Sequence, residues 1–186
     1  LTDVTGVQTC ALPISLGKVF NFTGVNNANM IIPDSETRDK FRVQRDADHY
    51  GSIDPLTHAA VCAGYGPKGS DWVREMKKYV AENINMIRDF FRSNIPDVRV
   101  SEVEGSFVKW IDWRGIRVDD DELQSYQLNE AYLDLDRGIN YGIGGKGFTR
   151  MNVAAPRGKI EESLGYLFDA AARRGYALSE TYNRWR

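Results

Sequence analysis

Two stretches decide how the sequence is interpreted: Ser15-Leu16-Gly17-Lys18-Val19-Phe20-Asn21 near the start and Gly147-Phe148-Thr149-Arg150-Met151-Asn152-Val153 near the end. A lysine amine can form a Schiff base with an aldehyde when burial or a nearby cation lowers its pKa. An arginine guanidinium matches a carboxylate with two parallel hydrogen bonds, which a lysine cannot do. Most lysines and strand arginines are exposed surface groups. The interpretation therefore depends on the two stretches occurring together.

The first residues of the chain are expected to have a different origin. The segment Val4–Ile14 reads VTGVQTCALPI, which is letter for letter the translation of a common short-read sequencing adapter. The alternatives are a natural strand or a signal peptide, but a signal peptide needs a basic start and a longer apolar run. We therefore predict that residues 1–14 are an adapter-derived scar, that Ser15 straddles the junction, and that natural sequence begins near Leu16.

Composition restricts the class of protein. The 186 residues are 42% hydrophobic and 27% charged, ordinary values for a globular protein, and the net charge of -2 gives no basic footprint for nucleic acid. No apolar run approaches the roughly 18 residues of a membrane span. Outside the predicted scar the one cysteine is Cys62, and His49 and His58 lack partners at metal-ligand spacing. We expect no disulfide, metal, nucleic acid or membrane partner, and a reducing cytoplasm.

Apolar periodicity, caps and breakers predict a mixture of helices and strands. Asp34 or Ser35 can cap one helix, and Asp54-Pro55 places a cap before a proline at the first helical position of the next. Helices are predicted over residues 34–46, 54–63, 70–94 and 159–174. Strands are predicted over residues 29–32, 98–103, 107–113 and 149–153, with the second and third forming a hairpin around Glu104-Gly105. The strand at 29–32 is expected to be buried.

Three further segments have ordinary structural interpretations. The acidic run Asp119–Asp121 is typical of a helix cap and first turn, which we favour over a metal site. The segment Gly142–Gly147 leads into a strand rather than a helix, so we predict a loop at the substrate mouth instead of a dinucleotide site. Gly17-Lys18 lacks the earlier glycine and the following Ser or Thr of a nucleoside-triphosphate loop. Gly175 fits the C-terminus of the last helix.

In this order, the segments resemble the fold-type I pyridoxal-phosphate (PLP) enzymes. Within the class I/II aminotransferase superfamily, the cystathionine β-lyase (C–S lyase) branch is the most similar. The resemblance rests on the two opening stretches, on Asp54-Pro55-Leu56, and on the hairpin Glu104–Trp110. It implies an α/β fold in which a remnant of the large PLP-binding domain, residues 15–68, precedes an α+β C-terminal small domain. That small domain, residues 69–186, includes the long connecting helix.

The resemblance also implies roles for individual residues. Lys18 matches the catalytic lysine that holds the cofactor, and Arg150 matches the arginine that binds the substrate α-carboxylate. Ser15 stands where some relatives place a phosphate-binding hydroxyl, and Arg157 is expected to brace the small domain. The family's phosphate-cradling glycines, stacking aromatic, and ring-binding Asn and Asp lie upstream of this segment. We therefore expect that the chain alone does not assemble a full site.

The leading interpretation is the C-terminal half of a PLP-dependent carbon–sulfur β-lyase. It would act on a small amino-acid substrate, cystathionine or a cysteine conjugate, through a Schiff base on Lys18, and would form a homodimer when full length. An aminotransferase of the same superfamily is the first alternative. The second is a non-catalytic α/β binding module in which Lys18 and Arg150 are structural.

Overall fold

A computed structural model describes residues 12–102 and 104–177 of the chain. The chain divides into unit 1, Leu1–Met76, and unit 2, Lys77–Arg186, with the division inside the long helix α3 (Pro67–Asn94). The predicted domain boundary after residue 68 lies near the start of that helix and stays a prediction. Helix α3 begins earlier than the predicted residue 70 because Pro67, which has no N–H to leave unpaired, suits the first helical position.

Unit 1 contains a two-stranded antiparallel sheet. Strand β1 (Leu12–Ile14) pairs with β2 (Asn29–Ile31), so that Leu12 lies opposite Ile31. The end of the predicted scar thus lies in a strand, and its origin stays a prediction. Strand β2 confirms the expected strand, but the prediction that it is buried is wrong: its three residues are exposed, and only the next residue, Ile32, is buried. The reason is that β1 is the only strand partner of β2 among the described residues.

The two short helices of unit 1 form where their caps predict them. Helix α1 (Ser35–Ala47) is capped by Asp34, whose Oδ1 accepts a hydrogen bond from the Thr37 amide at 2.7 Å. Helix α2 (Pro55–Gly64) is capped by Asp54 and has a proline at its first position. Helix α1 buries none of its residues, so local capping rather than packing accounts for it.

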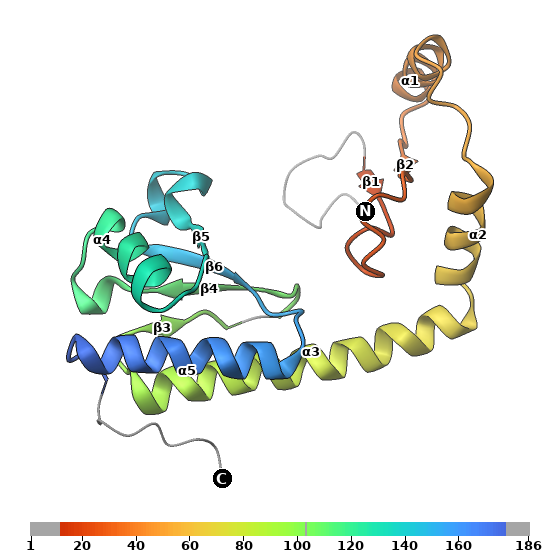
Figure 1. Cartoon of the computed structure of the whole chain (residues 1–186). Helices are drawn as coiled ribbons and strands as arrows, with labels where there is room; N and C mark the ends of the chain where they lie inside the picture. The colour runs from red at the N-terminus through yellow and green to blue at the C-terminus, as the bar shows by residue number, and fades with distance from the viewer. Residues whose placement is uncertain (1–11, 103, 178–186) are drawn as a thin grey trace. The chain divides into compact units, whose positions relative to one another are not determined.

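Unit 2 is built on a four-stranded antiparallel sheet in the order β3-β4-β6-β5 (Figure 1). The strands are β3 (Arg99–Val100), β4 (Val108–Asp112), β6 (Phe148–Asn152) and β5 (Asp136–Arg137). The pairing of β3 with β4 confirms the predicted hairpin, although Val103 of the predicted first strand lies outside the described residues. Strand β5 was not predicted, because a two-residue strand carries no readable periodicity.

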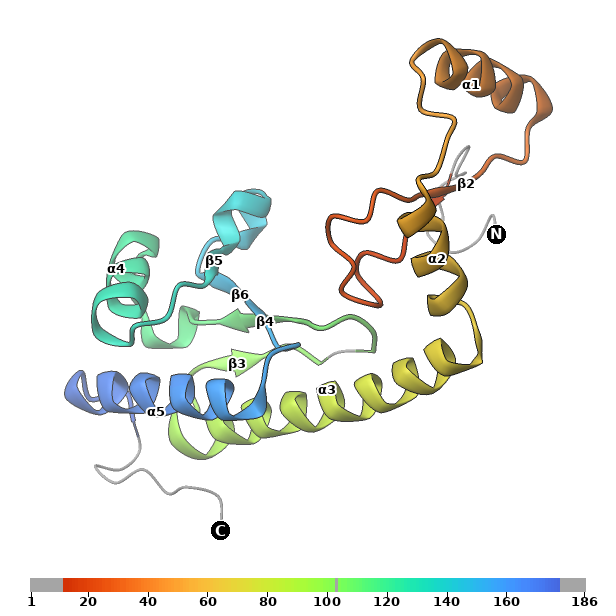
Figure 2. The same cartoon turned by 45° about the vertical axis from the view of Figure 1, so that its right-hand side comes forward.

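Two helices cover one side of this sheet. Figures 1 and 2 show α5 (Arg157–Arg173) lying alongside the C-terminal half of α3. The predicted apolar face of α5 is buried, at Ile160, Leu164, Leu167, Phe168 and Ala171. From α3 the core takes Val80, Ile87, Phe90 and Phe91, whereas Trp72 and Tyr79 of its predicted apolar stripe are 46% and 42% exposed.

Polar contacts link α3 to the segment between β6 and α5 and to the start of α5. The buried amide of Asn83 on α3 donates to the carbonyls of Val153 and Ala155 at 3.1 and 3.0 Å. Arg157 donates to Glu82 of α3 at 2.6 Å, a contact consistent with the bracing role predicted for it. Gly175, with φ +73°, follows α5 in the left-handed conformation that glycine adopts without strain.

Short helices complete unit 2. Helix α4 (Asp120–Ser125) begins after Asp119, whose Oδ1 accepts from the amides of Asp121 and Glu122, as the acidic run predicts. A π-helical turn follows at Tyr126–Glu130. Single 3-10 turns lie at Arg114–Ile116, Gly138–Tyr141 and Ile143–Gly145. Within residues 12–102 and 104–177 no cluster of His, Cys, Asp and Glu could hold a metal ion.

Candidate functional site

Lys18 lies on an exposed turn of unit 1. The Phe20 amide donates to the Leu16 carbonyl at 3.0 Å and closes the turn. Leu16 is 1% exposed and lies against α2, where a Cβ on Gly64 would come within 3.1 Å of its Cδ2. Leu16 thereby anchors the turn and leaves Lys18 exposed. In the part of the chain that the structure describes, the Lys18 ammonium makes no hydrogen bond or ion pair.

Ser15 stabilises the same turn. Its Oγ accepts a hydrogen bond from the Gly17 amide at 3.1 Å, and its side chain is exposed. The hydroxyl hydrogen is therefore free to donate to another group. Lys18 and Ser15 thus present an amine and a hydroxyl from one short segment.

Arg150 lies in the middle of β6, in unit 2. Its neighbours in register are Trp110 on β4 and Asp136 on β5. Its Nε donates to Asp136 Oδ2 at 2.8 Å, and its Nη2 donates to the same oxygen. The guanidinium carbon also lies 4.9 Å from the centre of the Tyr141 ring. The hydrogen bonds that the guanidinium donates to Asp136 raise its pKa further above the ordinary value.

The surroundings of Arg150 form a cavity of about 260 Å³. One wall is the chain from Leu133 to Asp136 together with Arg150–Asn152, and another is the start of α5, with Lys159 and Ser163. Lys159 is paired with Glu162 at 2.9 Å. Both cations are thus paired, but only the planar Arg150 guanidinium can engage a small carboxylate with two parallel hydrogen bonds, in exchange for Asp136 or beside it.

The structure thus places the three predicted site residues in different units: Lys18 and Ser15 in unit 1, and Arg150 in unit 2. Their convergence on one cleft stays a prediction. Sequence reasoning missed Asp136, the carboxylate partner of Arg150. Its alternation with Asp134 in the run Leu133-Asp134-Leu135-Asp136 is the signal that could have indicated a short strand with acidic groups on one face.

The segment Gly142–Gly147 leads into β6, as predicted. Gly142 and Gly147 have positive φ values of +119° and +77°. A Cβ on Gly147 would come within 2.6 Å of the Arg114 Cγ. Glycine is therefore required here by backbone conformation and close packing, and neither requirement involves a phosphate.

Comparison with known structures identifies the fold. No protein-family model matches the chain. A PLP-bound protein from Clostridium difficile 630, described as an aminotransferase, superposes with a TM-score of 0.82 and 26% identity over 86% of this chain and 41% of that one. Cystalysin from Treponema denticola, which contains PLP, superposes with a TM-score of 0.80 and 30% identity over 88% and 41%. The mixed α/β fold predicted from the sequence is therefore confirmed as that of the PLP-dependent aminotransferase class.

The sequence itself is similar to a particular branch of that class. The cystathionine beta-lyase PatB of Bacillus subtilis (strain 168) is 31% identical over 156 residues, which cover 84% of this chain and 39% of PatB. The resemblance to the cystathionine β-lyase branch is therefore confirmed. The chain spans about two fifths of the length of the relatives it matches.

One further property follows from the helices. Among the described residues no helix combines the length and the apolar character that crossing a membrane requires.

Proposed function

We propose that the chain is the C-terminal part of a PLP-dependent carbon–sulfur β-lyase. The observation that carries the proposal is the ion pair of Arg150 with Asp136, in a protein similar to cystathionine β-lyases. It supports the proposal because a guanidinium that binds a carboxylate lies on the wall of a cavity of about 260 Å³. The substrate would be cystathionine or another cysteine S-conjugate.

The residues present fit the cofactor. Lys18 offers an amine with no partner among the described residues, and Ser15 offers a hydroxyl in the same turn. These two side chains would hold PLP by its aldehyde and its phosphate. When bound, PLP serves as an electron sink that makes loss of the substrate α-proton possible.

Arg150 and Lys18 would then have separate roles in the reaction. Arg150 binds and orients the α-carboxylate through its fork. The Lys18 Nζ would be placed to accept the substrate α-proton. The substrate loses its thiol from the β-carbon, and hydrolysis of the remaining aminoacrylate gives pyruvate and ammonia. The reaction therefore consumes one water for each thiol released.

An aminotransferase is the second candidate, favoured by the superposition on the PLP-bound protein described as an aminotransferase. The products separate the two. A lyase releases thiol, pyruvate and ammonia without a second substrate. An aminotransferase consumes a 2-oxo acid and releases no thiol. A coupled assay for pyruvate, with a thiol reagent in parallel and no added 2-oxo acid, distinguishes them.

We also propose that the full-length protein is a cytoplasmic homodimer with sites near the subunit interface. A molar mass twice that of one chain, measured by light scattering on the full-length protein, is the expected result. A monomer with full activity would contradict this part of the proposal.

The central experiment uses a full-length protein obtained by extending the reading frame upstream of Leu16. Lys18→Ala should abolish turnover and the cofactor's absorbance band, because both depend on its amine. Lys68→Ala removes an exposed lysine of α3 and is the matched control, with unchanged activity expected. Normal turnover after Lys18→Ala would refute the assignment.

Arg150→Ala in the same protein should chiefly raise KM and lower kcat/KM, through loss of the carboxylate fork, by on the order of 10²-fold for a charged hydrogen-bonding pair. Arg88→Ala, at a half-exposed arginine of α3, is the matched control. In a crystal structure of the full-length protein, the Cα atoms of Lys18 and Arg150 should lie roughly 10–15 Å apart across one cleft. Placement on opposite faces would exclude a shared site.

A further inference from the structure

The sheet face that carries Arg150 also carries aromatic side chains. Trp110 on β4 lies opposite Arg150 on β6, and Phe148 is two residues before Arg150 on the same strand. Side chains alternate between faces along a strand, so all three share one face. The intervening residues Ile111 and Thr149 take the other face and are 1% and 2% exposed. The aromatic face is therefore the one that the core does not use.

The rings on this face are held in a fixed arrangement. Tyr141 comes from the turn before β6, and its ring centre lies 5.4 Å from that of Trp110 at an interplanar angle of 86°. Phe148 lies 6.2 Å from Trp110 at 87°. Both are edge-to-face arrangements, which aromatic pairs prefer. Because Arg150 stacks over Tyr141, the rings have a defined position beside the guanidinium.

A cavity of about 290 Å³ opens among these rings, lined by Trp110, Tyr141 and Phe148 with Gly144 and Gly145. A Cβ on Gly145 would come within 2.0 Å of the Gly138 carbonyl oxygen, so the loop closes by direct backbone contact. The cavity lies just below the usual range of roughly 300–1,000 Å³ for small-molecule sites. It is large enough for an apolar substituent of a substrate.

The charges beside the rings decide which substituent fits. Among the described residues, the charged groups recorded over these rings are two cations: Arg150 over Tyr141, and Arg114, whose guanidinium carbon lies 4.5 Å from the centre of Phe148. Each guanidinium is already paired with a carboxylate. An apolar or aromatic group would bury its surface against the rings. A charged substituent would instead lose its hydration beside two guanidiniums that already have carboxylate partners.

We propose that Trp110, Tyr141 and Phe148 form a specificity subsite for an apolar or aromatic substituent on the substrate sulfur, next to the carboxylate bound by Arg150. The inference rests on the proposed role of Arg150 and extends it to the side chain of the substrate. S-aryl- and S-alkyl-cysteines are then bound in preference to cystathionine, whose distal end carries an ammonium and a carboxylate that would both have to leave water.

The test uses the 186-residue chain with labelled tryptophan, titrated with S-benzyl-cysteine, alanine and cystathionine. The indole N–H resonance of Trp110, assigned with Trp110→Phe, reports on the subsite. The indole N–H of Trp113 donates to Thr149 Oγ1 at 2.7 Å and is buried, so its resonance reports that unit 2 is folded. S-benzyl-cysteine should shift the Trp110 resonance and leave that of Trp113 in place. The dissociation constant of S-benzyl-cysteine should be at least about tenfold lower than the dissociation constants of alanine and cystathionine.

Two variants separate the subsite from the carboxylate site. Tyr141→Leu keeps the Trp110 probe and should weaken S-benzyl-cysteine at least about fivefold more than it weakens alanine, which shares only the contact through Arg150. Tyr166→Leu, at an exposed tyrosine of α5, is the matched control. Arg150→Gln should weaken both ligands.

The outcomes are distinct. Equal affinity for S-benzyl-cysteine and alanine, or an unmoved Trp110 resonance while Trp113 shows a folded unit, would overturn the subsite. If Arg150→Gln changes neither affinity but Tyr141→Leu still weakens S-benzyl-cysteine, the subsite stands and the proposed role of Arg150 fails.

Discussion

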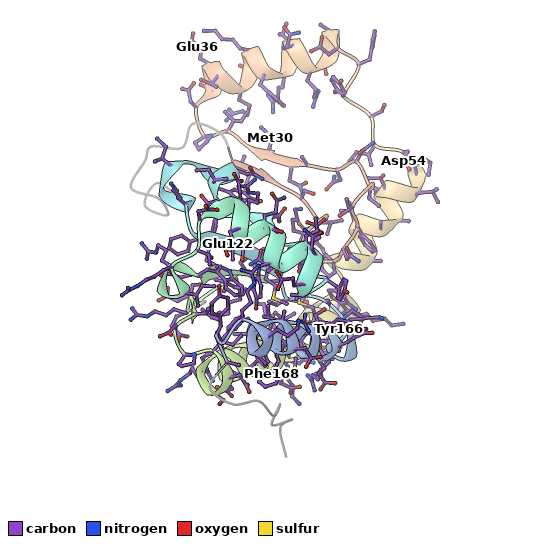
Figure 3. All side chains as sticks on the ribbon, turned by 60° about the vertical axis from the view of Figure 1, so that its left-hand side comes forward. Met30, Glu36, Asp54, Glu122, Tyr166 and Phe168 are labelled. Carbon is purple, nitrogen blue, oxygen red and sulfur yellow. The ribbon has the colours of Figure 1, made fainter. Side chains whose placement is uncertain are left out.

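Unit 1 and unit 2 are specified by the same kinds of local signal, yet they differ in how much surface they bury. In unit 1 the caps Asp34 and Asp54 start two helices, but α1 buries no residue and Leu56 on α2 is 83% exposed. In unit 2 the helices meet a sheet, and Leu164 on α5 is 1% exposed. Figure 3 shows side chains crowded around Phe168 and sparse around Glu36. Capping thus positions a helix, whereas a cooperative core needs a second layer.

Hydrogen exchange gives the largest expected contrast. Amides of Ile87 and Leu164 should exchange only through global unfolding of unit 2, whereas amides of α1 should exchange by local fraying. We expect protection factors that differ by about a thousandfold or more, equal to roughly 4 kcal/mol of opening free energy. Nuclear magnetic resonance on the whole chain measures both sets at once. Equal protection in α1 and α5 would remove the distinction between the units.

The same substitution in both units is the next test. Leu164→Ala creates a cavity in the core and should lower the free energy of unfolding of unit 2 by about 2–5 kcal/mol. Leu56→Ala removes an exposed side chain and should change stability by no more than about 0.5 kcal/mol. Denaturant melts followed by the indole N–H resonance of Trp113 measure the first, and melts followed by the backbone carbon chemical shifts of α2 measure the second. A large effect of Leu56→Ala would show that unit 1 buries this leucine.

A buried amide gives a smaller effect. Asn83→Leu leaves the carbonyls of Val153 and Ala155 without their donor and should cost about 1–3 kcal/mol. Asn129→Leu is the matched control, because Asn129 is exposed and bonds only Ser125 Oγ in the described structure. Equal unfolding midpoints for the two variants would mean that Asn83 does not hold α3 to the end of β6.

Acidification should produce the smallest change at the start of α2. The Thr57 hydroxyl and amide hold the pKa of Asp54 below its ordinary value of 3.8. A lowered folded-state pKa means that the cap stabilises α2 above pH 3.8 and is lost as the pH falls through the lowered value. Carbon chemical shifts of α2 should lose helical character in that window, and Asp54→Asn should remove the pH dependence. Unchanged α2 shifts down to pH 2 would contradict the role of the cap.

Local sequence signals predicted most of the elements. Asp34, Asp54 and Asp119 each cap a helix where expected, and Gly175 ends the last one. These predictions succeeded because a cap, a proline or a glycine acts on the residues next to it. The buried face of α5 was also predicted, since its apolar residues recur at helical spacing.

Contacts between distant segments were not predictable in the same way. The pairing of Asp136 with Arg150 depends on the register of β5 against β6, which no local motif specifies. The stacking of Tyr141 under Arg150 has the same origin.

The burial of Lys109 could not be predicted from the sequence, although the strand that contains it was. Lys109 is fully buried, its Nζ donates to the Ser101 carbonyl, and burial lowers its pKa. Nothing in the residue type indicates this, because lysines are mostly exposed.

Strand β1 has a consequence for how the chain behaves in concentrated solution. If residues 1–14 are foreign, as predicted, then β2 forms a ladder with a segment that was never selected to fit it. Backbone hydrogen bonds between strands do not depend on side-chain identity. The edge of β2 that pairs with β1 can therefore also pair with an extended segment of another chain. The edge of β2 is then a place where one molecule can exchange strands with another, and association through it would rise with protein concentration.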